Sequence, residues 1–257
     1  MNRRLIALSA LIPAILLGLI ISVALISAEA QARTPSDTVR EFYKAMREKR
    51  FREAFDMSIY KPAIDGLKPQ QFEDLRGDFE KMSQAVPDKI DITGEQISGE
   101  QATVFLKVPH ADDPAQFDTE PVALIRVNGV WIIGDRENQE VVRKAGADFF
   151  FNARIETHHS EVQSIFTRIN LAQLAYAQQH NGLYGNMGAL IQVGLLPKDL
   201  EGTDSTGYRF HINLARDAKS FSVSAEPAQY GRSGKLSFFM DQNGIRSSDT
   251  GGKPLEP

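Results

Sequence analysis

Four side chains within one helical turn have the residue types that bind transition metals. Glu156, His158, His159 and Glu161 lie close together, and Glu156–His159 and His158–Glu161 both have the i, i+3 spacing that places two ligands on one helix face. Adjacent histidines point in different directions from a helix, however, and two ligands do not complete a metal site. We therefore expect a hydrated helix surface here and no metal.

Oxygen ligands gather near the C-terminus, where Asp241, Asn243 and Asp249 could hold a calcium ion. Calcium takes six or more oxygen ligands, and this segment is short of acids. Asn243-Gly244 is also the commonest pair in a tight hairpin turn, because both residues tolerate positive φ angles. We favour the hairpin, and the sequence leaves calcium binding by the Asp241–Asp249 segment open.

Two motifs of catalytic proteins occur only in part. Ser58-Ile59-Tyr60-Lys61 has the S-x-x-K spacing of serine acyl-enzymes, but the companion Ser-Asp-Asn and Lys-Thr-Gly motifs are absent. Gly129 to Gly134 has the glycine spacing of a phosphate-binding loop, but Asp135-Arg136 stands where Lys-Ser/Thr is required. The chain has no cysteine, which excludes disulfides, thiolate metal sites, a cysteine nucleophile and lipoprotein acylation. We therefore predict no catalytic residue, no cofactor and no enzyme activity.

The charge of the chain argues against a nucleic-acid partner. Its 29 basic and 33 acidic residues give a net charge of −4 at pH 7, whereas a nucleic-acid-binding surface needs a clear basic excess. Basic side chains do cluster between Arg40 and Arg52, but Glu41, Glu48 and Glu53 interrupt them. We interpret this stretch as a solvated helix surface.

Residues 1–32 form the strongest targeting signal. Arg3 and Arg4 precede an uncharged run from Leu5 to Ala28, rich in Leu, Ile and Ala and long enough to cross a bilayer as a helix. Small residues at positions 28, 30 and 32 also offer signal-peptide cleavage sites. The segment is a membrane anchor through residues 5–26 or a cleaved signal peptide, and both alternatives stay open. Either way we expect residues 33–257 to be exported to the cell envelope, as a periplasmic or inner-membrane-anchored protein.

Residues 33–138 show helical patterns first and strand patterns afterwards. Thr34-Pro35-Ser36-Asp37 is a typical helix start, and apolar residues then recur at helical spacing as far as Met82. From Ile90 they alternate with polar residues, and Asn128-Gly129 predicts a hairpin turn. Helices followed by an antiparallel sheet indicate an α+β fold. A sheet that curls over helices makes a cone, and its pocket would be lined by five aromatic residues: Tyr43, Tyr60, Phe72, Phe105 and Trp131.

Residues 139–257 repeat this order with a longer helix. Helical patterns run from Gln139 to Asn181, and we expect Phe149-Phe150-Phe151 to dock on the preceding sheet. The apolar stripe of this helix comprises Val162, Ile165, Phe166, Ile169, Ala172, Leu174 and Tyr176. A short helix is predicted at Met187–Leu196, followed by strands at Tyr208–Leu214, Ser220–Ala225, Leu236–Asp241 and Ile245–Ser247. We therefore expect a long helix packed on a small antiparallel sheet.

The first exported part resembles a known superfamily through Pro35–Tyr43, Phe51–Phe55 and Asn128–Ile133. On these residues, 35–137 resemble the nuclear-transport-factor-2-like cone superfamily, in particular its small exported members. Catalytic members of that superfamily place Asp and His side chains in the cone. Here the only histidine before residue 158 is His110, on a loop rich in Pro and Asp. The resemblance therefore implies a cone fold without the catalytic residues.

Residues 155–250 are similar to another family through six segments in matching order: Arg168–Gln173, Tyr176–Ala177, Asn181–Gly185, Leu190–Leu196, Gly207–Phe210 and Phe238–Arg246. These resemble the globular head of type IV pilins and of the major pseudopilin of type II secretion. Pilins, however, begin with a Gly-Phe processing site and carry a Glu early in their hydrophobic helix, and Leu5–Ile26 has neither. The resemblance implies a pilin-like head that does not polymerise in the usual way.

Together these patterns predict three segments: residues 1–32, a cone-like domain at 33–138 and a pilin-like domain at 139–257. Our preferred hypothesis is a non-catalytic interaction or assembly protein of the cell envelope, whose partners are other envelope proteins and the membrane but not nucleic acid. The alternative is a small apolar-ligand carrier or enzyme that uses the cone-like pocket.

Overall fold

The computed structural model describes residues 33–110, 113, 116–203 and 206–256. The predicted anchor or signal peptide at residues 1–32 lies outside them. Residues 33–257 form one compact unit that combines helices with antiparallel sheets, so the predicted α+β class is confirmed. In the part of the chain that is described, no helix is both long enough and apolar enough to span a membrane.

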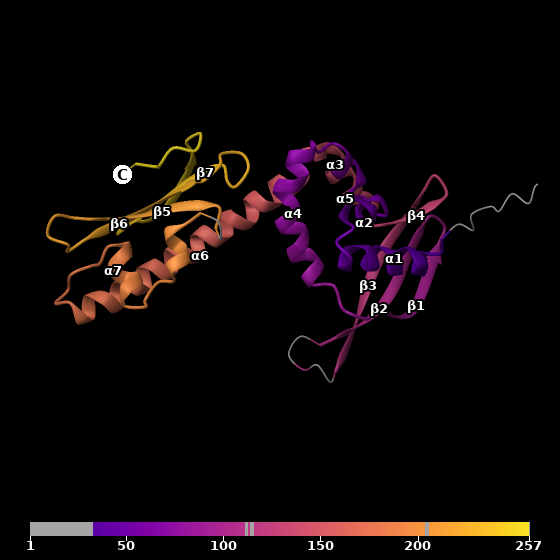
Figure 1. Cartoon of the computed structure of the whole chain (residues 1–257), viewed down its shortest axis with the longest axis horizontal. Helices are drawn as coiled ribbons and strands as arrows, with labels where there is room; N and C mark the ends of the chain where they lie inside the picture. Colours follow the sequence, from indigo (N-terminus) through magenta and orange to yellow (C-terminus); the bar gives the residue numbers. More distant parts are fainter. Residues whose placement is uncertain (1–32, 111–112, 114–115, 204–205, 257) are drawn as a thin grey trace, which may run out of the picture. The chain divides into compact units, whose positions relative to one another are not determined.

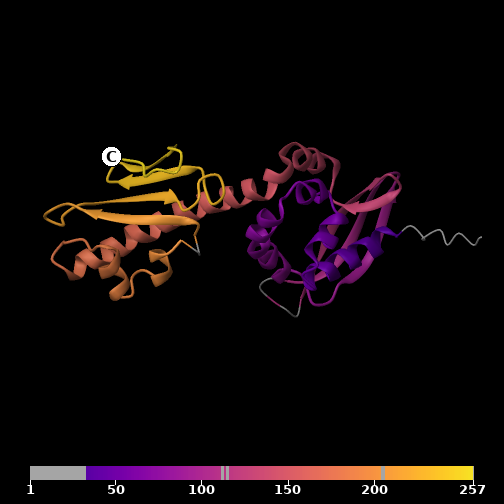
Figure 2. The same cartoon turned by 45° about the horizontal axis from the view of Figure 1, so that its top comes forward.

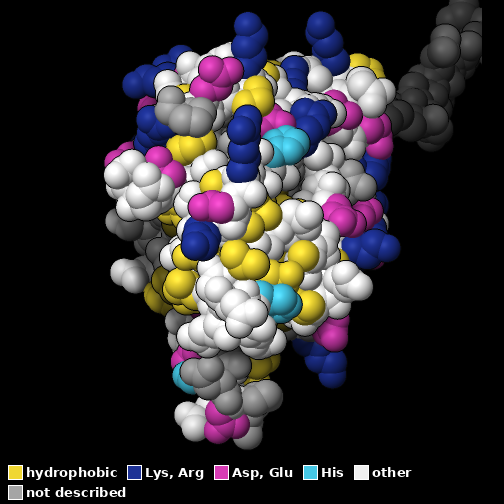
Figure 3. Space-filling model, turned by 90° about the vertical axis from the view of Figure 1, so that its left-hand side faces the viewer, with side chains coloured by type: hydrophobic (Ala, Val, Ile, Leu, Met, Phe, Trp, Pro, Cys, Tyr) yellow, Lys and Arg dark blue, Asp and Glu magenta, His cyan; other side chains and the backbone are white. Residues whose placement is uncertain are grey.

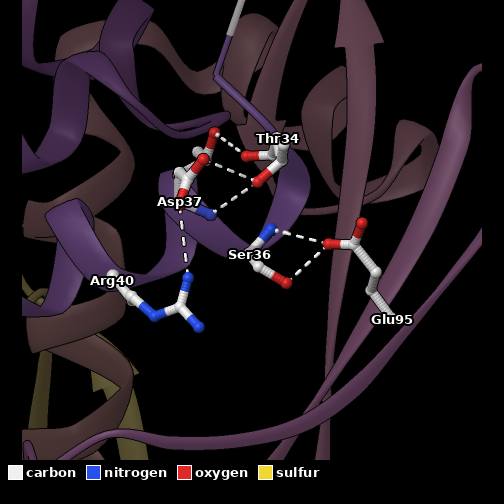
Figure 4. A network of polar contacts seen from close by, with 6 residues as sticks. Thr34, Ser36, Asp37, Arg40 and Glu95 are labelled. Atoms are coloured by element: carbon white, nitrogen blue, oxygen red, sulfur yellow. Dashed lines mark hydrogen bonds and ion pairs between the residues drawn. The ribbon is translucent and has the colours of Figure 1, made fainter.

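Four helices open the described chain: α1 (Pro35–Arg47), α2 (Phe51–Asp56), α3 (Lys61–Asp65) and α4 (Pro69–Gln84). Helix α1 begins where the sequence predicts, because the Thr34 hydroxyl accepts a hydrogen bond from the Asp37 amide at 3.1 Å. The Glu95 carboxylate, on strand β1 (Asp91–Ser98), accepts hydrogen bonds from the Ser36 amide and hydroxyl (Figure 4). These contacts tie the start of the described chain to the sheet.

The first sheet is an antiparallel meander in the order β1-β2-β3-β4, completed by β2 (Gln101–Pro109), β3 (Phe117–Val127) and β4 (Val130–Ile133). Asn128 and Gly129 have φ angles of 51° and 80°, so the predicted hairpin turn is confirmed. Helix α1 lies across this sheet in Figure 1, and its Val39 packs in one cluster with Val104 and Leu124.

A second cluster fills the space between the helices and contains most of the phenylalanines. The Phe79 ring lies 5.0 Å from that of Phe55 and 5.1 Å from that of Phe150. Phe150 belongs to helix α6 (Phe149–Gln179), which follows α5 (Arg136–Ala145) and the short η1 (Gly146–Asp148). The predicted Phe149–Phe151 docking site is thus formed mainly by helical side chains, and Ile125 of β3 is the buried sheet residue in the same cluster.

The remaining chain builds a second sheet against the rest of α6. After α7 (Met187–Gln192) and η2 (Lys198–Glu201), strands β5 (Tyr208–Leu214), β6 (Phe221–Pro227), β7 (Leu236–Asp241) and β8 (Gly244–Asp249) pair antiparallel in sequence order. Figures 1 and 2 both show α6 lying along one face of this sheet. Phe166 and Ile169 of α6 are fully buried there, in one cluster with Val223 and Phe238. The predicted long helix on a small sheet is therefore present.

Candidate functional site

The five aromatic residues predicted to line a pocket do not share one lining. Trp131 is 7% exposed and packs with the half-buried Tyr43 in the cluster between α1 and the first sheet. Tyr60 and Phe72 belong to the separate helical cluster. Phe105 alternates along β2 with Val104, which lies in the α1 cluster, and therefore points to the other face of the sheet. Burial raises the pKa of both Tyr43 and Tyr60, as expected for phenols packed in cores.

Phe72 also borders a surface depression of about 440 Å³ with basic side chains around it. The Arg52 guanidinium lies 4.1 Å from the Phe72 ring centroid and the Arg76 guanidinium 5.8 Å from it. Arg76 is paired with Glu73 at 2.6 Å. Arg50, which also lines the depression, contacts three acids: Glu41, Glu48 and Glu53. Most of this positive charge is neutralised locally, in keeping with a solvated surface.

The histidines of the candidate metal site tie α6 to the loop before β7. His158 Nδ1 lies 2.7 Å from the carbonyl oxygen of Ser233, and His159 Nε2 lies 3.4 Å from the amide nitrogens of Lys235 and Leu236. Burial lowers the pKa of His159, which favours the neutral ring that can accept these bonds. Across the described residues, no three His, Asp or Glu side chains are grouped so that they could hold a metal ion.

The candidate calcium ligands take part in turns. Asp241 pairs with Gly244 across the β7–β8 hairpin, so the predicted hairpin is confirmed. Its turn residues are Gln242 and Asn243, however, and of the predicted Asn243-Gly244 pair Gly244 alone has a positive φ, 117°. The Asp241 carboxylate accepts a hydrogen bond from the Asn243 amide at 2.8 Å. Asp249, at the far end of β8, accepts hydrogen bonds from the Tyr230 hydroxyl at 2.9 Å and from the Gly251 amide at 3.0 Å. Each carboxylate is therefore engaged by its own turn.

One buried acid was missed by the sequence reasoning. Glu226 of β6 is 6% exposed, and its Oε1 lies 3.0 Å from Nε2 of His211 on β5, whereas Oε2 has no hydrogen-bond partner in the described structure. Alternation along β6 predicts a solvent-facing side chain at this position. On the neighbouring strand β7, the Ser237 hydroxyl donates a hydrogen bond to the Lys253 carbonyl oxygen at 2.7 Å, so the chain after β8 returns to this sheet.

Helix α6 presents an exposed stripe with a regular repeat on the side away from its sheet. The stripe follows alternating steps of four and three residues, and all its members are uncharged and exposed: Ala153, Thr157, Ser160, Ser164, Thr167, Leu171, Leu174 and Gln178. Leu171 is 62% exposed and Leu174 is 48% exposed, although both lie within a regular helix. We call this set the α6 stripe. Its period of 3.5 residues is the spacing of helices that pair along a seam.

The predicted apolar stripe of α6 is wrong at Leu174, because this side chain is exposed and the neighbouring Gln173 is buried instead. Gln173 is 0% exposed and forms two hydrogen bonds with the backbone of Gly185, at 2.7 Å to its carbonyl oxygen and 2.9 Å from its amide. The loop after α6 supplies these partners, so a polar side chain fits inside. Hydrophobicity alone could not reveal this exchange.

The end of the molecule seen in Figure 3 carries a further gathering of hydrophobic side chains in the middle of the view, with Lys and Arg mainly toward its top. Within the second half of the chain, a depression of about 310 Å³ is lined by Asn170, Tyr184, Phe221 and Met240, among others. Leu183, just beyond α6, is 39% exposed. Apolar surface in this half is therefore not confined to the α6 stripe.

No family model, no curated protein and no solved structure matches this chain.

Proposed function

We propose that this chain is a non-catalytic, exported protein of the bacterial cell envelope that acts by binding other proteins. In this proposal residues 33–138 form a cone-like module and residues 139–257 a pilin-like binding head, and the membrane is reached through residues 5–26 if they are not cleaved. The hydrophobic segment at residues 1–32 supports export. The α6 stripe supports a binding role.

The exposed leucines of the α6 stripe are the single observation that carries this proposal. A soluble helix usually turns its leucines to the core, yet Leu171 and Leu174 remain 62% and 48% exposed on an otherwise well-packed helix. Burying each of them against a partner would contribute about 1 kcal/mol. Two exposed leucines on an uncharged strip of helix surface therefore support an interface.

The alternative function, a carrier or enzyme with an apolar ligand in the cone, draws no support from the proposed lining. Tyr43 and Trp131 lie in one cluster and Tyr60 and Phe72 in another. These side chains stabilise two cores, so we do not prefer the carrier.

Photo-cross-linking in living cells tests the proposed function. A photoreactive amino acid at Leu174 of the full chain should give protein adducts, whereas the same label at Val141 of α5, which is 52% exposed, should give none. A periplasm-specific reporter fused after Pro257 should also be active. No adduct at Leu174, equal adducts at both positions, or an inactive reporter would contradict the proposal.

A further inference from the structure

We propose that the partner of the α6 stripe is the α6 stripe of a second copy of this chain, with the two helices antiparallel. This inference rests on the proposed function, because it names the partner of the same surface. It follows from three properties of the helix: the period of the stripe, the distribution of large and small side chains along it, and the charges that flank it.

The period of the stripe suits a helical partner. Residues separated by alternating steps of four and three keep facing one neighbouring helix if the two wind gently around each other. In the stripe this spacing is unbroken from Ala153 to Gln178. The same helix uses a different face for its own sheet, where Phe166 and Ile169 are fully buried. The second helix would therefore add to the fold without replacing any contact within it.

The hydroxyl groups of the stripe can be buried without losing hydrogen bonds. Thr157, Ser160, Ser164 and Thr167 each donate to the backbone carbonyl oxygen four residues earlier, at 3.1, 3.3, 3.2 and 3.1 Å. Each hydroxyl therefore already has its partner within α6. Small side chains without unmet polar groups allow a neighbouring helix to come close.

Side-chain size selects the antiparallel direction. The first half of the stripe is small and the second half contains both leucines. A parallel pair would place small residues opposite small ones and leave voids, which destabilise packing. In an antiparallel pair, one register places Ser160 opposite the second copy's Leu171 and Thr157 opposite its Leu174. Each large side chain then meets a small one.

The flanking charges select the same direction and register. Glu161 and Arg168 are exposed beside the stripe, and neither joins an ion pair within the described residues. The register that aligns Ser160 with Leu171 also brings Glu161 next to the second copy's Arg168, and symmetry forms this pair twice. A parallel pair would instead bring Glu156 next to the second copy's Glu161, which is repulsive.

The surface beside the stripe has room for this pairing. Glu161, Ser164 and Arg168 border a depression of about 250 Å³, and Pro197 and Asp199 lie on it as well. An arginine side chain from the second copy could extend into this depression and reach Glu161. Asp199 adds a second acid near the same place. The depression therefore has space for the second copy's arginine, and its acidic side chains would attract that arginine.

Cross-linking between single cysteines tests the direction, because the chain has no cysteine of its own. We would prepare the full-length chain in membranes as Ala153→Cys and as Gln178→Cys, and treat each variant and their mixture with a short bismaleimide. In the proposed register Ala153 faces the second copy's Gln178, whereas two copies of either position lie about 37 Å apart along the helix. Neither substitution removes a leucine of the stripe.

A covalent dimer from the mixture but not from either variant alone is the expected result. Dimers from each variant alone would show a parallel pair and overturn the inference, and so would the lack of any dimer. A mixture of Val141→Cys with Gln178→Cys serves as the control and should give no product. Adducts from Leu174 with a different protein, without these dimers, would leave the proposed function standing while this inference fails.

Charge exchange tests the register independently. In the detergent-solubilised full chain, Glu161→Arg and Arg168→Glu should each weaken dimerisation about tenfold, because two attractive pairs become repulsive. The double variant re-forms both pairs with the charges exchanged and should recover the original dissociation constant, measured by sedimentation. If the double variant dimerises more weakly than either single variant, the proposed register is wrong.

Discussion

The two halves of the described chain differ in what they bury, although both expose some large hydrophobic side chains, among them Phe117 and Val130 in the first half. In the first half most phenylalanines pack in a core between helices, and Arg50 is paired with three acids. In the second half Gln173 and Glu226 lie inside, while Leu171 and Leu174 lie outside. The two leucines share one uncharged stripe on a single helix, and for this reason we assign the binding function to the second half.

The largest effect on stability is expected in the first half, at Phe79. This side chain is fully buried, and its ring lies within 5.7 Å of those of Phe51, Phe55, Phe72 and Phe150. Phe79→Ala should lower the free energy of unfolding by about 3–5 kcal/mol, because it leaves a cavity where four rings meet. Urea denaturation measures this loss. If Phe79→Ala lowers the free energy of unfolding no more than a substitution of an exposed side chain does, the rings around Phe79 do not form one continuous core.

The next largest effect is expected from a polar residue in the second half. Gln173→Ala removes both hydrogen bonds to Gly185 and leaves the backbone groups of Gly185 without their partner. We expect a loss of about 1–3 kcal/mol in the same measurement. Gln179→Ala, at an exposed glutamine of the same helix that lies outside the α6 stripe, is the matched control and should change little. If Gln173→Ala and the control lower the free energy of unfolding equally, the hydrogen bonds of the Gln173 side chain do not stabilise the loop at Gly185.

A pH effect is expected at the contact between α6 and the loop before β7. Burial lowers the pKa of His159 below its usual 6.5, so its contribution to stability is present above pH 6.5 and is lost as the pH falls through the lower pKa of the folded state. Thermal unfolding should therefore shift downward between pH 7.5 and pH 5. The shift should be smaller in His159→Gln. An unchanged shift in this variant would assign the pH effect to other groups.

The smallest effect on stability, and the sharpest contrast with Phe79, is expected at the α6 stripe. Leu171→Ser and Leu174→Ser should change the free energy of unfolding by only about 0.5 kcal/mol, because both side chains are exposed. Leu171→Ser should also lose the adducts formed by the photoreactive label at position 174, and both variants should lose the cysteine-linked dimers. Strong destabilisation of the monomer would mean that the leucines serve the fold and not a partner.

Much of the local structure was predictable from residue patterns. The cap at Thr34 and the turn at Asn128-Gly129 depend on side-chain and φ preferences of neighbouring residues, and both are present. The β7–β8 hairpin is also present, but its turn lies one residue earlier than the Asn243-Gly244 pair predicts. The long helix followed by four strands was equally visible in the period of its apolar residues. Such features need no knowledge of distant contacts.

The α6 stripe was predictable in principle, because its four-three spacing stands in the sequence. The prediction that Leu174 belongs to the buried stripe rests on its hydrophobicity alone. On helix α6, adjacent positions point in directions about 100° apart, and the buried face includes Ala172 and Gln173 but not Leu174. Only the position of Gly185, which supplies two hydrogen bonds, decides that the glutamine is inside.

The sequence alone determined the order of the elements, the turns that join them and the hydrophobic segment at residues 1–32. These depend on periodicity and on the backbone preferences of single residues. Tertiary structure alone decided that the five predicted pocket residues divide between two clusters and the opposite face of a strand, that Glu226 is covered, and that two leucines remain outside. The physical reason is that burial is a property of what packs against a side chain, and those neighbours lie far away in the sequence.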